Sequence, residues 1–254
     1  MKKTDPTAMK CQLCQKDKKL LRKSHIISDF LYKDLFDKKH RLYEALLTQD
    51  YQIQSKVRQS GGYDKNILCG NCDNKIIGNL ERYASLVLFG GVDLSIKPES
   101  KESKSIYLDV EGIDYRKFKL FLLSILWRAG ISTLPIFQNV NLNEHQEVLR
   151  KRLLKNNPGD SSEYPCVIFT YLHHPKIPHQ MIVEPKVIRN NANQTYAYVF
   201  LIGGILFIFF IQTDDKAAWV QSCTINEKGK MRVIQMSENL TAKTISKITG
   251  LDLV

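Results

Sequence analysis

The sequence lacks any apolar segment long enough to cross a bilayer. The longest apolar run, YAYVFLIGGILFIFFI at 196–211, has a Gly-Gly pair at its centre. A membrane-spanning helix needs about 20 apolar residues, whereas Gly-Gly between apolar stretches is typical of a β-hairpin. The basic first residues are followed by CQLCQKDKKL, where a signal peptide would have an apolar region. We therefore expect a cytoplasmic protein with no signal peptide and no membrane partner.

Two common catalytic signatures are also missing. The chain has no Gly-rich phosphate-binding loop and no G-x-S-x-G nucleophile elbow, and it contains no internal repeat or low-complexity tract. Its 254 residues, 43% of them hydrophobic, are enough for one large folded domain or two small ones. The chemistry must therefore be sought in charge and in metal-ligating residues.

Acidic residues are in the minority, with 26 Asp and Glu against 37 Lys and Arg, which gives a net charge of +11. The excess is uneven: residues 1–60 hold 14 basic and 7 acidic residues, or +7. Such a segment suits a polyanion, most obviously DNA or RNA. A solvated, solubilising surface has the same composition, so charge alone leaves both interpretations open.

Cysteine is sparse, but four of the six cysteines form two C-x-x-C pairs, Cys11 with Cys14 and Cys69 with Cys72. In a reducing compartment such pairs favour metal over disulfides. Each tight C-x-x-C turn can fill two corners of a tetrahedral zinc site, so the pairs predict one structural Zn²⁺ ion. We interpret the isolated Cys166 and Cys223 as small buried residues in strands.

The hydrophobic pattern predicts an α+β protein in two parts. In the first part, residues 1–94, helical spacing covers 28–36, with Ser28 as a cap, and 73–89. The polar stretch 95–105 predicts a linker, and 106–254 forms a second domain of unknown role. In it, a strand at 105–112 precedes an apolar helix with basic, solvated ends at 115–130 and a helix at 143–155 capped by Asn143. Strands at 164–172, 194–202, 205–212 and 219–225 and a helix at 241–250 follow, so an antiparallel sheet packed by helices is expected.

The two Cys pairs are separated by 54 residues, and three short motifs lie in or beside this interval. They are CQLC at 11–14, SHII at 24–27 and NILCGNCDNK at 66–75. This order resembles the HNH endonucleases (the ββα-metal or His-Me finger group) in their version with a four-cysteine zinc site. The resemblance covers residues 9–90 and implies a small zinc-stabilised ββα domain. The chain is also similar to uncharacterised bacterial proteins with the same motifs.

The resemblance implies metal-dependent hydrolysis of phosphodiester bonds, with DNA as the expected partner. Carried over by position, His25 is the general base, and Asn66 or Asp64 orients it. Asp73 takes the place of the family's last His, where an oxygen ligand would hold Mg²⁺ or Mn²⁺. Analogy to the wider group suggests a role in bacterial defence against foreign DNA. The basic residues expected at the phosphates are Lys18, Lys19, Arg22, Lys23 and Lys75.

Two positions depart from the family pattern, and they leave other functions open. Ser24 replaces the Asp that usually precedes the first His, and Asp73 replaces the last His. A chain with the same zinc fold and degraded chemistry would be a nucleic-acid-binding protein. A third alternative is an adaptor in which the zinc module is only structural. In each case the second domain offers a surface for a partner protein or for a second copy of the chain.

Overall fold

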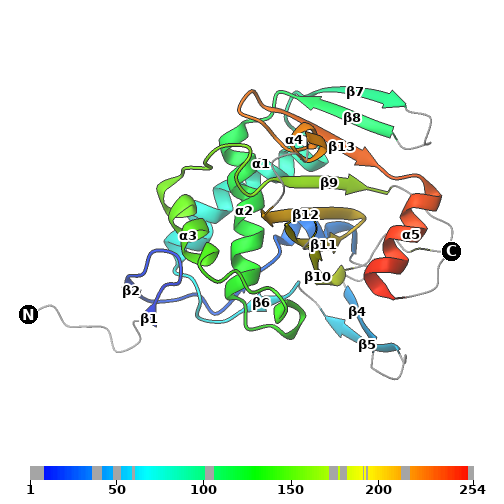
Figure 1. Ribbon diagram of the computed structural model, residues 1–254. Helices are drawn as coiled ribbons and strands as arrows, with labels where there is room; N and C mark the ends of the chain where they lie inside the picture. The colour runs from blue at the N-terminus through cyan, green and yellow to red at the C-terminus, as the bar shows by residue number, and fades with distance from the viewer. Residues whose placement is uncertain are drawn as a thin grey trace, which may run out of the picture.

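The computed structural model describes residues 9–35, 42–47, 53–58, 61–100, 106–171, 177, 182–190, 192, 194–212 and 218–250 (Figure 1). For Asp34, for 42–47 and 53–58 and for Ser100, only the backbone is considered. These ranges form a mixed α+β structure around a largely antiparallel sheet, which confirms the expected class. No helix within them has the length and apolar character needed to span a membrane.

The main sheet has seven strands in the order β10-β11-β12-β9-β13-β8-β7. Neighbouring strands are antiparallel except β9 and β13, which are parallel. The strands are β7 (Ser95–Ser100), β8 (Ile106–Glu111), β9 (Cys166–Thr170), β10 (Ile182–Asn190), β11 (Thr195–Ile202), β12 (Ile205–Gln212) and β13 (Lys230–Gln235).

The apolar run 196–211 forms the hairpin β11–β12, as predicted. Gly203 and Gly204 have φ angles of 55° and 76°, which a two-residue primed turn requires at both central positions. Strands β10 and β9 flank the hairpin, so both of its strands lie inside the sheet.

Helices cover both faces of this sheet. One face packs against α2 (Tyr115–Ile131) through aromatic residues of β11 and β12 such as Phe200 and Phe207. The opposite face packs against α4 (Ala218–Cys223) and α5 (Glu238–Thr249) through alternate residues such as Val199 and Phe210. A strand buried on both sides has few positions for polar residues, which explains its continuous apolar sequence.

Helix α2 lies at the centre of the molecule, because Phe118 to Ala129 are all buried. Asp114 caps its first turn by accepting a hydrogen bond of 3.0 Å from the Lys117 amide. Helices α1 (Gly78–Phe89) and α3 (His145–Lys155) pack against it, with the short 3₁₀ helix η3 (Pro135–Phe137) between α2 and α3. One hydrophobic core runs from Leu13 and Ile26 through α2 to the sheet.

The first part of the chain consists of short elements. Strand β1 (Met9–Lys10) pairs with β2 (Asp17–Lys18), and β3 (Ser24–His25) pairs with β6 (Tyr63–Asp64). Between β3 and β6 in the chain lie the 3₁₀ helix η1 (Asp29–Leu35) and the hairpin β4–β5 (Leu42–Leu47 and Ile53–Arg58). A π-helical turn, η2 (Asn71–Ile77), leads directly into α1.

Several expectations about elements were wrong. Residues 95–100 of the expected linker form β7, because they pair with β8; 101–105 lie outside the described residues, as does residue 36 of the first expected helix. The expected strand 219–225 is mostly helix α4, since Val220 and Cys223 lie one helical turn apart and both pack on the sheet. Helix α3 begins at His145 with Glu144 at its cap position, so Asn143 is not its cap. The Ser28 hydroxyl donates to Glu81 Oε1.

Candidate metal centre and the surface around His25

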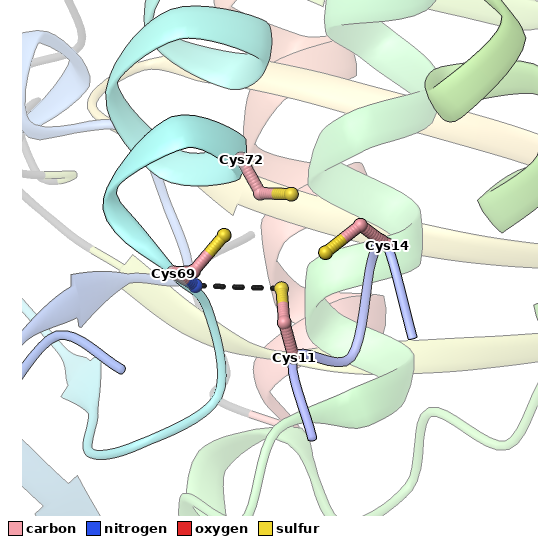
Figure 2. Close-up of side chains that lie close together, drawn as sticks. All are labelled: Cys11, Cys14, Cys69 and Cys72. Carbon is pink, nitrogen blue, oxygen red and sulfur yellow. Dashed lines mark hydrogen bonds between the residues drawn. The ribbon is translucent and has the colours of Figure 1, made fainter. Parts of the chain in front are cut away.

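The two Cys pairs converge as the sequence predicts. The sulfur atoms of Cys11, Cys14, Cys69 and Cys72 all lie within 4.8 Å of one another. Figure 2 shows the four side chains pointing toward a common centre: Cys11 and Cys14 from the loop between β1 and β2, Cys69 from just before η2, and Cys72 from the first turn of η2. All four are free cysteines.

Backbone hydrogen bonds hold each pair in a tight turn. In the first turn, Cys11 N donates to Lys16 O at 3.1 Å and Gln15 N to Cys11 O at 2.8 Å. Gln15 has a φ of 57°, which lets the chain reverse immediately after Cys14. The Cys69 amide donates to Cys11 Sγ at 3.3 Å, so the second turn is joined directly to a sulfur of the first.

The surroundings of the thiols fit a bound cation. Cys11, Cys69 and Cys72 are buried, and Cys14 is half-buried. Burial raises the pKa of Cys72, and its hydrogen bond with Cys69 and the nearby Cys11 add to that effect. The Cys72 thiol is thus poorly ionised on its own, whereas a cation would stabilise it as a thiolate. The cluster can hold a metal ion, and within the described ranges it is the only such group of His, Cys, Asp or Glu.

His25 lies on β3, opposite Tyr63 of β6. The two rings are edge to face with 6.4 Å between centroids. The His25 side chain is 33% exposed, but its Nε2 atom is buried and has no hydrogen-bond partner among the described residues; Asp29 Oδ1 lies 3.8 Å from it. The exposed area of the side chain therefore belongs to atoms other than Nε2.

Asp73 lies in the first turn of η2, immediately after Cys72, and is close to His25. Burial raises the pKa of Asp73, and the neighbouring Glu81 acts in the same direction. The Arg128 charge, the Ser24 hydroxyl and His25 lower it. Ser24 is fully buried, and within the described part of the chain its hydroxyl forms no hydrogen bond of ordinary geometry. The fold thus places two of the residues predicted to be catalytic within range of each other's charge.

The two candidates for orienting His25 are placed differently. Asp64 is buried, and its carboxylate accepts hydrogen bonds from Ser132 Oγ (2.6 Å), Thr133 N (3.0 Å) and Thr133 Oγ1 (2.5 Å). Asp64 therefore fixes the turn that follows α2. Asn66 is exposed with a φ of 58°, a conformation that asparagine tolerates well, and its backbone N–H donates to Leu21 O.

The basic residues expected at phosphates are all on the surface. Leu20 forms an isolated antiparallel β-bridge with Cys69, and Leu21 N donates to Leu68 O at 2.8 Å. The segment 18–23 therefore lies beside 66–69. Lys23 Nζ lies 4.8 Å from the centroid of the Tyr63 ring, the ring that contacts His25. The exposed side chains are Lys18, Lys19, Arg22, Lys23 and Lys75.

Sequence reasoning missed the buried charge nearest to this surface. Arg128, near the end of α2, was expected at a solvated helix end, but its side chain is 1% exposed. Its Nη1 atom lies 2.7 Å from Glu81 Oε1, and the Glu81 side chain is 25% exposed. The only signal in the sequence was one arginine in an otherwise apolar segment, FLLSILWRAG.

Comparison with known proteins returns no match to this chain among family models, curated proteins or solved structures. The motif resemblance to HNH endonucleases therefore stays a prediction. The four-cysteine cluster is a finding of the structure itself.

Proposed function

We propose that the four cysteines hold a structural Zn²⁺ ion and that the unit around them hydrolyses phosphodiester bonds in DNA, in the manner of an HNH endonuclease. One observation supports the proposal: β3 and β6 pair, the η2–α1 helix follows them, and Asp73, directly after Cys72, lies within range of the charge of His25. Two short strands followed by a helix are the order of elements that the ββα-metal resemblance implies.

Each side chain has a defined part in this proposal. The Zn²⁺ ion joins the two cysteine turns and so holds the loop between β1 and β2 against the start of η2. His25 accepts a proton from the attacking water, a task that suits an imidazole near neutral pH. Asp73 is the carboxylate that would hold Mg²⁺ or Mn²⁺, and such an ion, when bound, stabilises negative charge on the phosphate. Asn66 remains the residue proposed to orient His25.

The exposed basic residues would bind the DNA backbone. Lysines and arginines that contact phosphates position a duplex without reading its sequence. Lys23 is the best placed, because it lies over the Tyr63 ring next to His25. Binding of this kind weakens steeply as the salt concentration rises.

A non-catalytic nucleic-acid-binding protein is the second candidate, and one observation favours it. Within the described part of the chain, His25 and Asp73 belong to no group of three or more ligating side chains; only the cysteines do. Ser24, which replaces the family's Asp, is buried and is a poor metal ligand. A zinc-stabilised surface that binds DNA and does not cut it would have these features.

A cleavage assay separates the two candidates. Supercoiled plasmid, linear DNA, single-stranded DNA and RNA are incubated with Mg²⁺ or Mn²⁺ and wild-type protein, His25→Ala or His145→Ala. His145 is a matched control because it is a half-buried histidine on α3, where it bonds to Tyr164. Folding and zinc content are measured for all three proteins.

The nuclease proposal expects cleavage by wild type and His145→Ala and none by His25→Ala. Equal cleavage by all three would point to a contaminant or to another site. If no substrate is cut by wild-type protein, the nuclease proposal fails. Salt-dependent binding to DNA would then support the second candidate.

A further inference from the structure

Arg128 uses every N–H donor of its guanidinium group. Nη1 donates to Glu81 Oε1 (2.7 Å) and to His25 O (2.9 Å). Nη2 donates to Ser28 Oγ (3.1 Å) and Ser124 Oγ (3.4 Å), and Nε donates to Ser124 O (3.2 Å). An arginine carries five such donors, so none is left without an acceptor.

These contacts join three separate elements at one point. Arg128 and Ser124 belong to α2, Glu81 belongs to α1, and the His25 carbonyl ends β3. The Ser28 hydroxyl closes the network, because it accepts from Arg128 and donates to Glu81 Oε1 at 2.7 Å. The backbone of His25 is therefore held by a charge from a helix about a hundred positions further along the sequence.

Removing a charge from water is costly unless its partners are well placed. A lysine at the surface could link α1 to α2 at a lower desolvation cost. Joining these two helices therefore does not by itself explain a fully buried arginine. Within the described residues, the other side-chain hydrogen bonds between the two parts of the chain, such as Arg150 Nη1 to Leu13 O at 2.6 Å, are not made to β3. Among the described side chains that bond across these parts, Arg128 is the one that binds the His25 backbone.

We infer that Arg128 is a positioning residue for His25 and that α2, in the second part of the chain, completes the site instead of carrying a separate module. A guanidinium that fixes the His25 carbonyl limits how far the imidazole can move relative to Asp73. The consequence for cleavage rests on the proposed nuclease function, whereas the ordering of β3 does not.

The test uses the full chain and two readouts. The first is hydrogen exchange at the Ile26 amide, which donates to Gly62 O at 3.2 Å next to β3 and so reports on that pairing. The second is the single-turnover cleavage rate with enzyme in excess, which does not depend on the active fraction. The variants are Arg128→Lys, Ser28→Ala and the control Arg150→Lys, each checked for zinc content and melting temperature.

Lysine has three donors in a different geometry and cannot reproduce the network. Arg128→Lys should speed Ile26 exchange by about tenfold or more, since local opening of a short strand costs little. It should slow single-turnover cleavage on the order of 100-fold, the size of effect that a displaced catalytic group produces. Ser28→Ala should shift both readouts in the same direction, and Arg150→Lys should leave both unchanged.

The inference is overturned if Arg128→Lys folds and leaves Ile26 exchange unchanged, or if Arg150→Lys changes it equally. If Arg128→Lys does not fold, Ser28→Ala decides by the same criterion. A wild-type protein that cleaves nothing would refute the nuclease proposal, and the exchange readout would then decide alone whether Arg128 orders β3.

Discussion

Replacing Asp64 distinguishes a structural role from a catalytic one. Sequence motifs make Asp64 an alternative to Asn66 for orienting His25, but the structure places its carboxylate against Ser132 and Thr133. We therefore expect Asp64→Ala to destabilise the protein and Asp64→Asn to be mild. Neither change should alter the chemistry of the protein that remains folded.

The expected magnitudes follow from the three hydrogen bonds that Asp64 accepts. A hydrogen bond to a charged group contributes about 1.5–3 kcal/mol when buried. Thr133 is exposed and Ser132 is half-buried, so water can replace part of the hydrogen bonding that the Asp64 carboxylate provides. We therefore expect each bond to contribute about 1 kcal/mol. Asp64→Ala should then cost about 3 kcal/mol. In Asp64→Asn the amide oxygen can still accept from Thr133 N while its NH₂ donates to Thr133 Oγ1, so about 1 kcal/mol is expected.

Urea unfolding of both variants, beside wild type and the exposed control Asp93→Asn, measures these values. The control should remain within about 0.5 kcal/mol of wild type, as surface changes usually do. Single-turnover cleavage is measured on the same samples. A fall of about 100-fold in folded Asp64→Asn, typical of lost proton-transfer assistance, would show that Asp64 acts on His25 and refute the structural interpretation.

Three further predictions can be checked on the purified chain. It should contain one equivalent of zinc, and Cys69→Ser or a strong chelator should release the metal, make the remaining cluster thiols reactive and lower the melting temperature. Gly229→Ala should cost about 3 kcal/mol in thermal unfolding, because a Cβ there would lie 2.2 Å from Ile113 O at a φ of +73°; Gly250→Ala, with a similar φ of +77° but open space, should cost only about 1 kcal/mol. Burial lowers the pKa of Lys119 to about 8 in the folded protein, below its unfolded value of about 10.4. The unfolded state then binds the extra proton, so the contribution of Lys119 to stability should rise between about pH 8 and 10; the free energy of unfolding of wild type minus that of Lys119→Met should increase over this range.

The elements that the sequence predicts well are those with strong local signals. Helix α2 has a capping Asp114 and a long apolar run, and the Gly203-Gly204 pair marks a hairpin by its backbone freedom alone. Helix α4 was mistaken for a strand, since β-branched and aromatic residues favour strands unless packing decides otherwise. Strand β13 was missed because its six residues, KMRVIQ, mix charged and apolar side chains, and its place in the sheet depends on β8 and β9.

The four-cysteine cluster was predictable for a similar reason, because C-x-x-C sets the positions of two cysteines locally. The environment of His25 was not. Arg128 is near a helix end, where charges are usually solvated, and its acceptors come from Ser28, Glu81 and the His25 backbone. No spacing in the sequence relates these positions, so only the tertiary structure reveals the network.

The position of β13 has a consequence for how the protein is made. Of the strands in the described ranges it is the last to be synthesised, yet it lies between β9 and β8 and joins two halves of the sheet, β10-β11-β12-β9 and β8-β7. A growing chain can form the hairpin β11–β12 early, but α2 lacks a complete sheet to pack on until β13 has been added. Pairing between β8 and β13 spans about 120 positions, and contacts of such sequence separation form slowly. Until then the edges of β9 and β8 that β13 will cover lack a partner strand. The nascent chain should therefore depend on chaperones more than the folded protein does.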